Sequence, residues 1–110
     1  MKFINQSIID EIEELILKSD RTIETASLKT VEELGEFISA HFGLNSYKET
    51  TPDHLQEEMA DLMQCVISLY VLVNQKYPFD INKILAEKNI KWKQKYLQKR
   101  DSSSVSRAKD

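Results

Sequence analysis

Apolar residues recur every three to four positions along most of the chain, and this spacing predicts helices. We expect four, at about residues 4–18, 23–42, 52–76 and 81–100. Gly43 favours the end of the second helix, and a polar loop should follow over about residues 44–50. Thr51 followed by Pro52 is typical of an N-cap with proline in the first turn. Pro78 should end the third helix and Asp80 can cap the fourth, so the predicted fold is an all-α chain resembling a four-helix bundle.

The apolar stripes predict which side of each helix is buried. On the first helix the stripe is Ile4, Ile8, Ile12, Leu15 and Ile16, and on the second it is Leu28, Val31, Leu34, Ile38 and Phe42. The third helix is apolar nearly all round, apart from a polar strip of Glu57, Asp61, Gln64 and Ser68. A helix of this kind is buried on several sides. We therefore expect a second subunit to cover Met59, Met63, Tyr70 and Val71, in a homodimer or homotetramer.

Acidic residues interrupt this apolar pattern at positions that suggest a metal site. Glu58 lies within the apolar stripe of the third helix, and Asp61 follows three residues later. Glu33 and Glu36 repeat this spacing on the second helix. A buried, unpaired carboxylate costs several kcal/mol, so it needs a cation, a hydrogen-bond partner or a proton. Two such pairs on two helices can converge, and a divalent cation is the usual means of holding them together.

Length and composition narrow the class of protein. The 110 residues suffice for one domain, which we place at 1–100, with a flexible tail at 101–110. The lone Cys65 excludes a disulfide framework within the chain and is expected to be a buried thiol. A formal net charge of −3 argues against a nucleic-acid partner. The longest apolar run, Cys65–Val73, is too short for a membrane span, and the N-terminus lacks the basic start of a signal peptide, so we expect a cytoplasmic protein.

The predicted fourth helix carries cations within its apolar stripe. Lys88 falls at the centre of that stripe, with Lys95 close beside it. Such lysines can extend to solvent along the helix surface. Alternatively, they can meet a polyanion, or the carboxylates, inside the bundle.

Three segments together resemble a known family. The strings KTVEELGE at 29–36, EEMADL at 57–62 and EKNIKWKQKY at 87–96 are similar to the MazG-like all-α nucleoside triphosphate pyrophosphohydrolases. The family signature is E-E-x-x-E, a spacer and E-x-x-D, and the resemblance covers about residues 25–97. It implies a nucleotide substrate that is cleaved at the α–β bond to a monophosphate and pyrophosphate, with Mg²⁺ or alternatively Mn²⁺ as the cofactor.

The resemblance also implies roles for individual residues. Glu33, Glu36, Glu58 and Asp61 would be the catalytic magnesium ligands. Glu32 and Glu57 match the motif but are expected either to face solvent or to lie behind the ligands without touching the metal. Lys88, Lys91 and Lys95 would hold the phosphates, although this stretch lacks an arginine before Arg100. Asn5 and Trp92 are the candidates for contacting the base, and simple packing is the alternative for Trp92. His41 and His54 are expected to face solvent rather than to bind metal.

Three other classes of protein are alternatives to a nucleoside triphosphate pyrophosphohydrolase. A di-iron carboxylate bundle needs Glu-x-x-His motifs, and the sequence has none. A phosphoribosyl-ATP pyrophosphatase would share the bundle and the metal site. A non-catalytic helical interaction or regulatory module would explain solvated acidic faces but not the position of Glu58.

Overall fold

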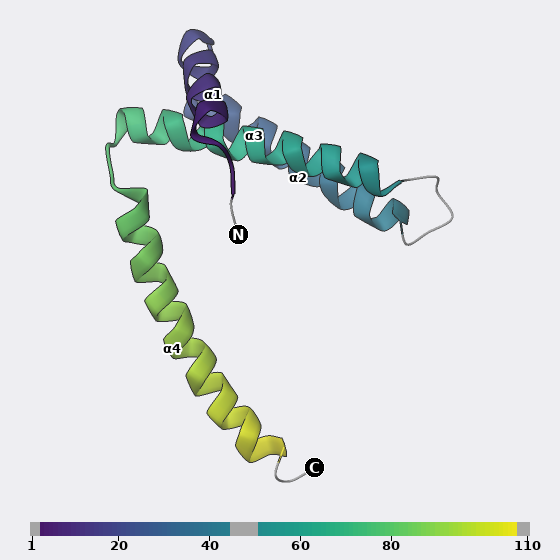
Figure 1. The fold of residues 1–110 in the computed structure, drawn as a ribbon, viewed down its shortest axis with the longest axis vertical. Helices are drawn as coiled ribbons and strands as arrows, with labels where there is room; N and C mark the ends of the chain where they lie inside the picture. The colour runs from purple at the N-terminus through teal and green to yellow at the C-terminus, as the bar shows by residue number, and fades with distance from the viewer. Residues whose placement is uncertain (1–2, 45–50, 108–110) are drawn as a thin grey trace. The chain divides into compact units, whose positions relative to one another are not determined.

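The computed structural model describes residues 3–44 and 51–107, with the side chains of the last helix described as far as Lys99. The described residues form the helices α1 (Gln6–Lys18), α2 (Ile23–Leu44), α3 (Pro52–Lys76) and α4 (Ile81–Arg107), which are labelled in Figure 1. No strand occurs among the described residues, so the all-α prediction is confirmed. The expected loop lies, apart from Leu44 at the end of α2, outside the described residues, and α4 continues through Arg107 into the predicted tail.

The chain forms two compact units, one of residues 1–78 with α1, α2 and α3, and one of residues 79–110 with α4.

The signals that begin the helices act as predicted. Thr51 caps α3 by accepting a hydrogen bond from the backbone N–H of His54 at 3.2 Å, and Pro52 occupies the first turn. The carboxylate of Asp80 accepts from the N–H of Lys83 at 3.2 Å and so caps α4.

The turn between α1 and α2 is held by Ser19. Its hydroxyl donates to the carbonyl of Ile16 at 2.7 Å and accepts from the N–H of Arg21 at 3.3 Å. The side chain of Thr22 then accepts from the N–H of Thr25 at 3.2 Å, which starts α2. These short-range bonds place Arg21 at the junction of the two helices.

The core of the first unit forms where α3 packs against both α1 and α2. Its centre is Ile16 of α1, Ala26 of α2, and Val71 and Leu72 of α3. Ile12 and Ile16 confirm the predicted stripe of α1, whereas Ile8 and Leu15 at the sides of that stripe are exposed.

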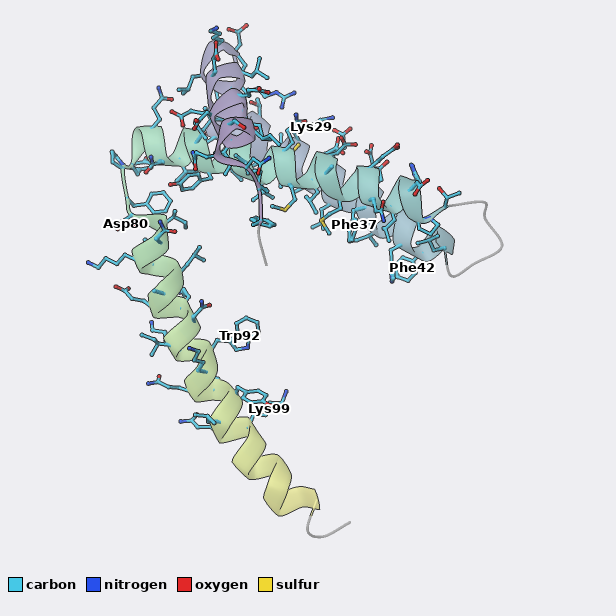
Figure 2. All side chains as sticks on the ribbon, viewed as in Figure 1. Lys29, Phe37, Phe42, Asp80, Trp92 and Lys99 are labelled. Carbon is cyan, nitrogen blue, oxygen red and sulfur yellow. The ribbon has the colours of Figure 1, made fainter. Side chains whose placement is uncertain are left out.

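The buried face of α2 differs from the prediction. All five stripe residues, Leu28, Val31, Leu34, Ile38 and Phe42, are exposed in this chain. Ala26, Ala40 and Gly43 are buried instead, together with Glu33. Small side chains allow α2 to approach α3 closely, and Figure 2 shows Phe42 projecting from the helix. The large apolar side chains of this stripe are therefore not covered by α1 or α3.

Two residues of α3 are also buried where the prediction had placed them on the surface of the chain. Val71, expected to face a second subunit, is buried in the core of its own chain. Ser68, expected in the polar strip, is also buried, and its hydroxyl donates to the carbonyl of Gln64 at 2.8 Å. A serine can enter a helical core in this way because its donor is satisfied by its own helix.

Candidate metal centre

α2 and α3 run side by side (Figure 1), and each carries one glutamate that is largely removed from solvent. Glu33 of α2 is only 6% exposed, and the side chain of Glu58 on α3 is 14% exposed. The predicted burial of Glu58 is thus largely confirmed, and Glu33 is buried even more deeply. Both occupy helix positions that would otherwise hold apolar side chains.

The carboxylates of the two helices converge. Glu33, Glu58 and Asp61 each offer an oxygen, and these oxygens lie within 4.8 Å of one another. Glu32, Glu33 and Glu36 form a second group with the same spacing. Glu33 belongs to both groups, so it joins the two helices into one acidic centre. All four residues predicted as metal ligands contribute to this centre.

One oxygen of each inner glutamate has no partner among the described residues. These atoms are Oε2 of Glu33 and Oε2 of Glu58, and both are buried. An unpaired buried acceptor costs free energy, and a negatively charged one costs more. A cation that both oxygens could bind would remove this cost. Hard carboxylate oxygens suit Mg²⁺ and Mn²⁺, so the donor set fits the predicted metal.

The other oxygen of each inner glutamate faces a basic side chain four residues earlier on its helix. Nζ of Lys29 lies 3.1 Å from Oε1 of Glu33 and 3.4 Å from Oε1 of Glu32. Nε2 of His54 lies 3.6 Å from Oε1 of Glu58. Sequence analysis missed both contacts, although the i,i+4 spacing could have indicated them. His54 is half-exposed, as expected, and it lies beside a predicted ligand.

Three pKa shifts reflect the charge of this centre. The charge of Glu33 raises the pKa of Glu36, and burial and the charge of Glu58 add to the effect. A hydrogen bond to Glu33 raises the pKa of Lys29. Burial, followed by the charge of Glu33, raises the pKa of Cys65, so this thiol stays protonated near neutral pH and is a poor nucleophile.

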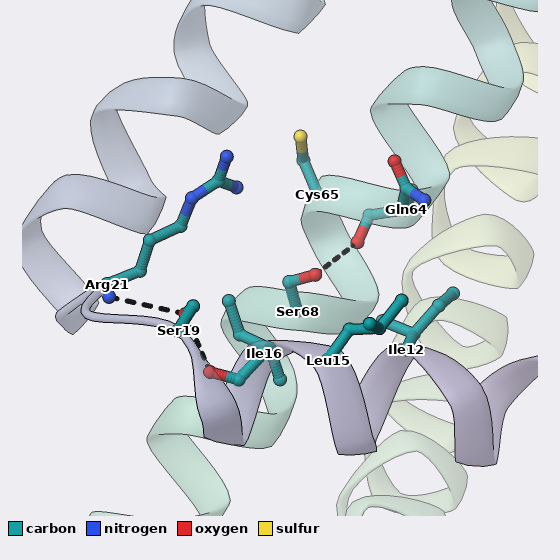
Figure 3. A pocket seen from close by; sticks show the side chains of 8 residues that line it. All are labelled: Ile12, Leu15, Ile16, Ser19, Arg21, Gln64, Cys65 and Ser68. Atoms are coloured by element: carbon teal, nitrogen blue, oxygen red, sulfur yellow. Dashed lines mark hydrogen bonds between the residues drawn. The ribbon is translucent and has the colours of Figure 1, made fainter.

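A pocket lies between α1 and α3 (Figure 3). It has a volume of about 230 Å³. One wall is apolar and comes from α1, with Ile12, Leu15 and Ile16. The rest comes from the turn, with Ser19 and Arg21, and from α3, with Gln64, Cys65 and Ser68. We call it the α1–α3 pocket.

None of the residues predicted to bind substrate is among those that line the α1–α3 pocket. Asn5 stands directly before α1 and does not line the α1–α3 pocket. Lys88, Lys91, Lys95 and Trp92 lie on α4, in the second unit (Figure 2). Their roles in binding phosphate and base stay predictions. Sequence analysis did not assign Arg21 to any site, because only the folded turn brings it to a pocket.

Paired carboxylates on adjacent helices are typical of all-α proteins that bind divalent metal ions, and metal-dependent hydrolases are one class of such proteins. The profile of the MazG nucleotide pyrophosphohydrolase domain matches residues 21–97, more than half of the chain. The chain therefore belongs to the MazG family, and the predicted resemblance is confirmed. No curated protein and no solved structure matches the chain significantly. Among the described residues, no helix is long and apolar enough to cross a membrane.

Proposed function

We propose that the protein is a Mg²⁺-dependent nucleotide pyrophosphohydrolase that cleaves the α–β bond of a nucleoside triphosphate. The products would be a nucleoside monophosphate and pyrophosphate. Membership of the family supports a nucleotide pyrophosphohydrolase in general. The observation that carries the metal requirement is the pair of buried, unpartnered oxygens on Glu33 and Glu58.

Each carboxylate would have a distinct role. Glu33, Glu58 and Asp61 would hold the ion, because their oxygens already lie within 4.8 Å of one another. An ion held by these residues would supply activation of water and stabilisation of the charge that develops during cleavage. Glu36 would accept the proton of the attacking water at its carboxylate. Its carboxylate lies within 4.8 Å of Glu33 but outside the group of Glu33, Glu58 and Asp61, so it would be free to act as a base beside the ion.

The basic residues would divide between the metal centre and the phosphates. Lys29 already pairs with Glu33, so it would hold that side chain in position. Lys88, Lys91 and Lys95 of α4 are proposed to bind the phosphate tail, in line with the family resemblance. Each lysine provides a point charge with up to three donors, which suits a polyphosphate.

We also propose that the protein assembles with a second copy of itself. The stripe of α2, which includes Leu28, Val31 and Phe42, is left open by α1 and α3 and supports this proposal, and so does the exposed Met59 of α3. Large contiguous apolar surfaces are uncommon on monomeric proteins. Sedimentation at micromolar concentration should give a dimer or tetramer, and a stable monomer would contradict the proposal.

Product analysis tests the activity directly. The chain should be incubated with each of the common ribo- and deoxyribonucleoside triphosphates, with Mg²⁺ or with a chelator. Pyrophosphate and monophosphate should form only when the metal is present. Release of orthophosphate and a diphosphate would contradict α–β cleavage, and full activity in chelator would contradict the metal requirement.

A further inference from the structure

The α1–α3 pocket begins one helical turn from the metal centre. Cys65, which lines it, follows Asp61 by four residues on α3, and the charges of Glu33 and Asp61 both act on its thiol. We propose that this pocket binds the base of the nucleotide and that Arg21 selects uracil or thymine there. This inference rests on the proposed function for the presence of a nucleotide, and it adds the class of base.

The size of the pocket suits a base rather than an entire nucleotide. Its volume of about 230 Å³ lies below the range of about 300–1,000 Å³ that is usual for sites enclosing larger ligands. A single pyrimidine ring is smaller than a purine or an entire nucleotide, so it suits this volume better. The sugar and the phosphates would then extend out of the pocket toward the carboxylates near Asp61.

One wall of the pocket can cover a flat ring. Ile12 and Ile16 are buried in the core, whereas the neighbouring Leu15 is 65% exposed. An apolar side chain that is left uncovered beside polar groups is the usual composition of a ligand site. A base that covered Leu15 would remove apolar surface from water, and the 5-methyl group of thymine would add to this contact.

The polar wall has a definite hydrogen-bonding capacity. Ser19 already donates to the carbonyl of Ile16 and accepts from the N–H of Arg21. Ser68 already donates to the carbonyl of Gln64, so its hydroxyl can only accept a further bond. The guanidinium of Arg21 contains donors alone and makes no ion pair with the described residues. The side-chain amide of Gln64 can both donate and accept.

This capacity matches a pyrimidine with two carbonyl groups. Uracil and thymine present carbonyl acceptors on both sides of one ring N–H donor. Arg21 can donate to a carbonyl, and Gln64 or Ser68 can accept from the N–H. Cytosine keeps one carbonyl but has an amino group in place of the other and an unprotonated ring nitrogen in place of the N–H. In one orientation its amino group would face the guanidinium of Arg21, and in the other its ring nitrogen would face the hydroxyl of Ser68, which can only accept. An unmatched polar group in a pocket weakens binding strongly.

The test measures binding without requiring catalysis. The full chain with Mg²⁺ is titrated calorimetrically with dUMP, dTMP, dCMP and dAMP, and pyrophosphate release from the matching triphosphates is followed in parallel. We expect dUMP and dTMP to bind at least about tenfold more tightly than dCMP and dAMP, a value typical of one good base contact. Arg21→Met should remove this preference while keeping the thermal stabilisation by Mg²⁺, and Arg21→Lys should restore part of it.

Lys18→Met is the matched control. Lys18 is also a cation near the end of α1, but it pairs with the exposed Glu14 and does not line the pocket. This variant should keep the preference of the parent. Equal binding of the four monophosphates, no binding of any of them, or an unchanged preference in Arg21→Met would overturn the inference.

The two proposals fail in different ways. Pyrophosphate release without a preference among bases would support the proposed activity and overturn the role of Arg21. A preference for dUMP that depends on Arg21, without release of pyrophosphate from any triphosphate, would support the pocket and overturn the activity.

Discussion

The acidic segments of α2 and α3 are built alike. Each has a basic residue, an inner glutamate four positions later and an outer carboxylate three positions after that. These are Lys29, Glu33 and Glu36 on α2, and His54, Glu58 and Asp61 on α3. In both segments the inner glutamate has one oxygen near the basic residue and one buried oxygen with no partner among the described residues.

The segments differ in how firmly the inner glutamate is held. Glu33 is more buried than Glu58, and Lys29 approaches it at 3.1 Å, whereas His54 stays 3.6 Å from Glu58. A lysine is charged throughout the neutral range, but a histidine is charged only when protonated. The comparison indicates that α2 would supply a fixed half of the proposed metal centre and α3 a more adjustable half.

The largest expected effect would follow from replacing either inner glutamate. Glu33→Gln and Glu58→Gln should each slow pyrophosphate release at least about 100-fold, because each removes a charged metal ligand. Glu57→Gln is the matched control, since it makes the same change at an exposed neighbouring position. If only one of the inner variants is impaired, the two halves are not equivalent ligands.

Removal of the metal should have the next largest effect. Mg²⁺ at 100 times its dissociation constant adds about 2.7 kcal/mol by mass action, which corresponds to a rise in Tm of about 10 °C for a domain of this size. Na⁺ at matched ionic strength should have a much smaller effect. Glu58→Gln should lose most of the rise and melt at or above the metal-free parent, because it removes a negative charge from a side chain whose buried Oε2 has no partner among the described residues. A metal-free variant that melts well below the parent, with its Mg²⁺ response intact, would make Glu58 a structural residue.

Replacing the basic residue beside each inner glutamate tests how the two halves of the centre differ. Without metal, Lys29→Met should lower Tm more than His54→Gln, because Lys29 is closer to the more buried glutamate. Lys29→Met should also tighten Mg²⁺ binding, measured by calorimetry, because a positive charge beside the site is removed. Equal losses of Tm, or weaker Mg²⁺ binding, would contradict the comparison.

Lys18→Met is again the control for loss of a lysine. Its contact with Glu14 is only 2.7 Å, but both partners are exposed. Exposed ion pairs contribute little to stability, so Tm should change less than in Lys29→Met.

The smallest effect concerns pH. The pKa of Glu36 is raised above its ordinary value of 4.5, mainly by the charge of Glu33. Its contribution to stability is therefore present below the unfolded pKa and is lost as pH rises through the folded pKa. Without metal, the Tm of Glu36→Gln should increase relative to the parent as pH rises from about 4 to about 7. A difference that does not change with pH would contradict the electrostatic coupling of Glu36 to Glu33.

The helices and the acidic residues could be predicted because their signals are local. Periodicity placed the four helices, and the side chains of Thr51 and Asp80 marked two of the starts. The position of Glu58 within an apolar stripe indicated its burial, since that depends only on the geometry of one helix.

Features that depend on contacts between helices were missed. Hydrophobic periodicity gives most weight to large side chains, so it assigned Leu28 and Phe42 to the buried face of α2. Ala26 and Gly43 carry little apolar signal, but they allow the approach to α3 that decides burial. Arg21 lines its pocket only because the turn brings α1 onto α3, and no pattern along the chain indicates this.

The proposed metal centre requires that α2 and α3 share one metal ion through their inner glutamates. A crystal structure of the chain with Mn²⁺, using anomalous scattering, tests it most directly. We predict a peak bonded to Oε2 of Glu33 and Oε2 of Glu58, with Asp61 as a further ligand. A peak bonded only to Glu32, Glu33 and Glu36, or no peak near either helix, would contradict the claim.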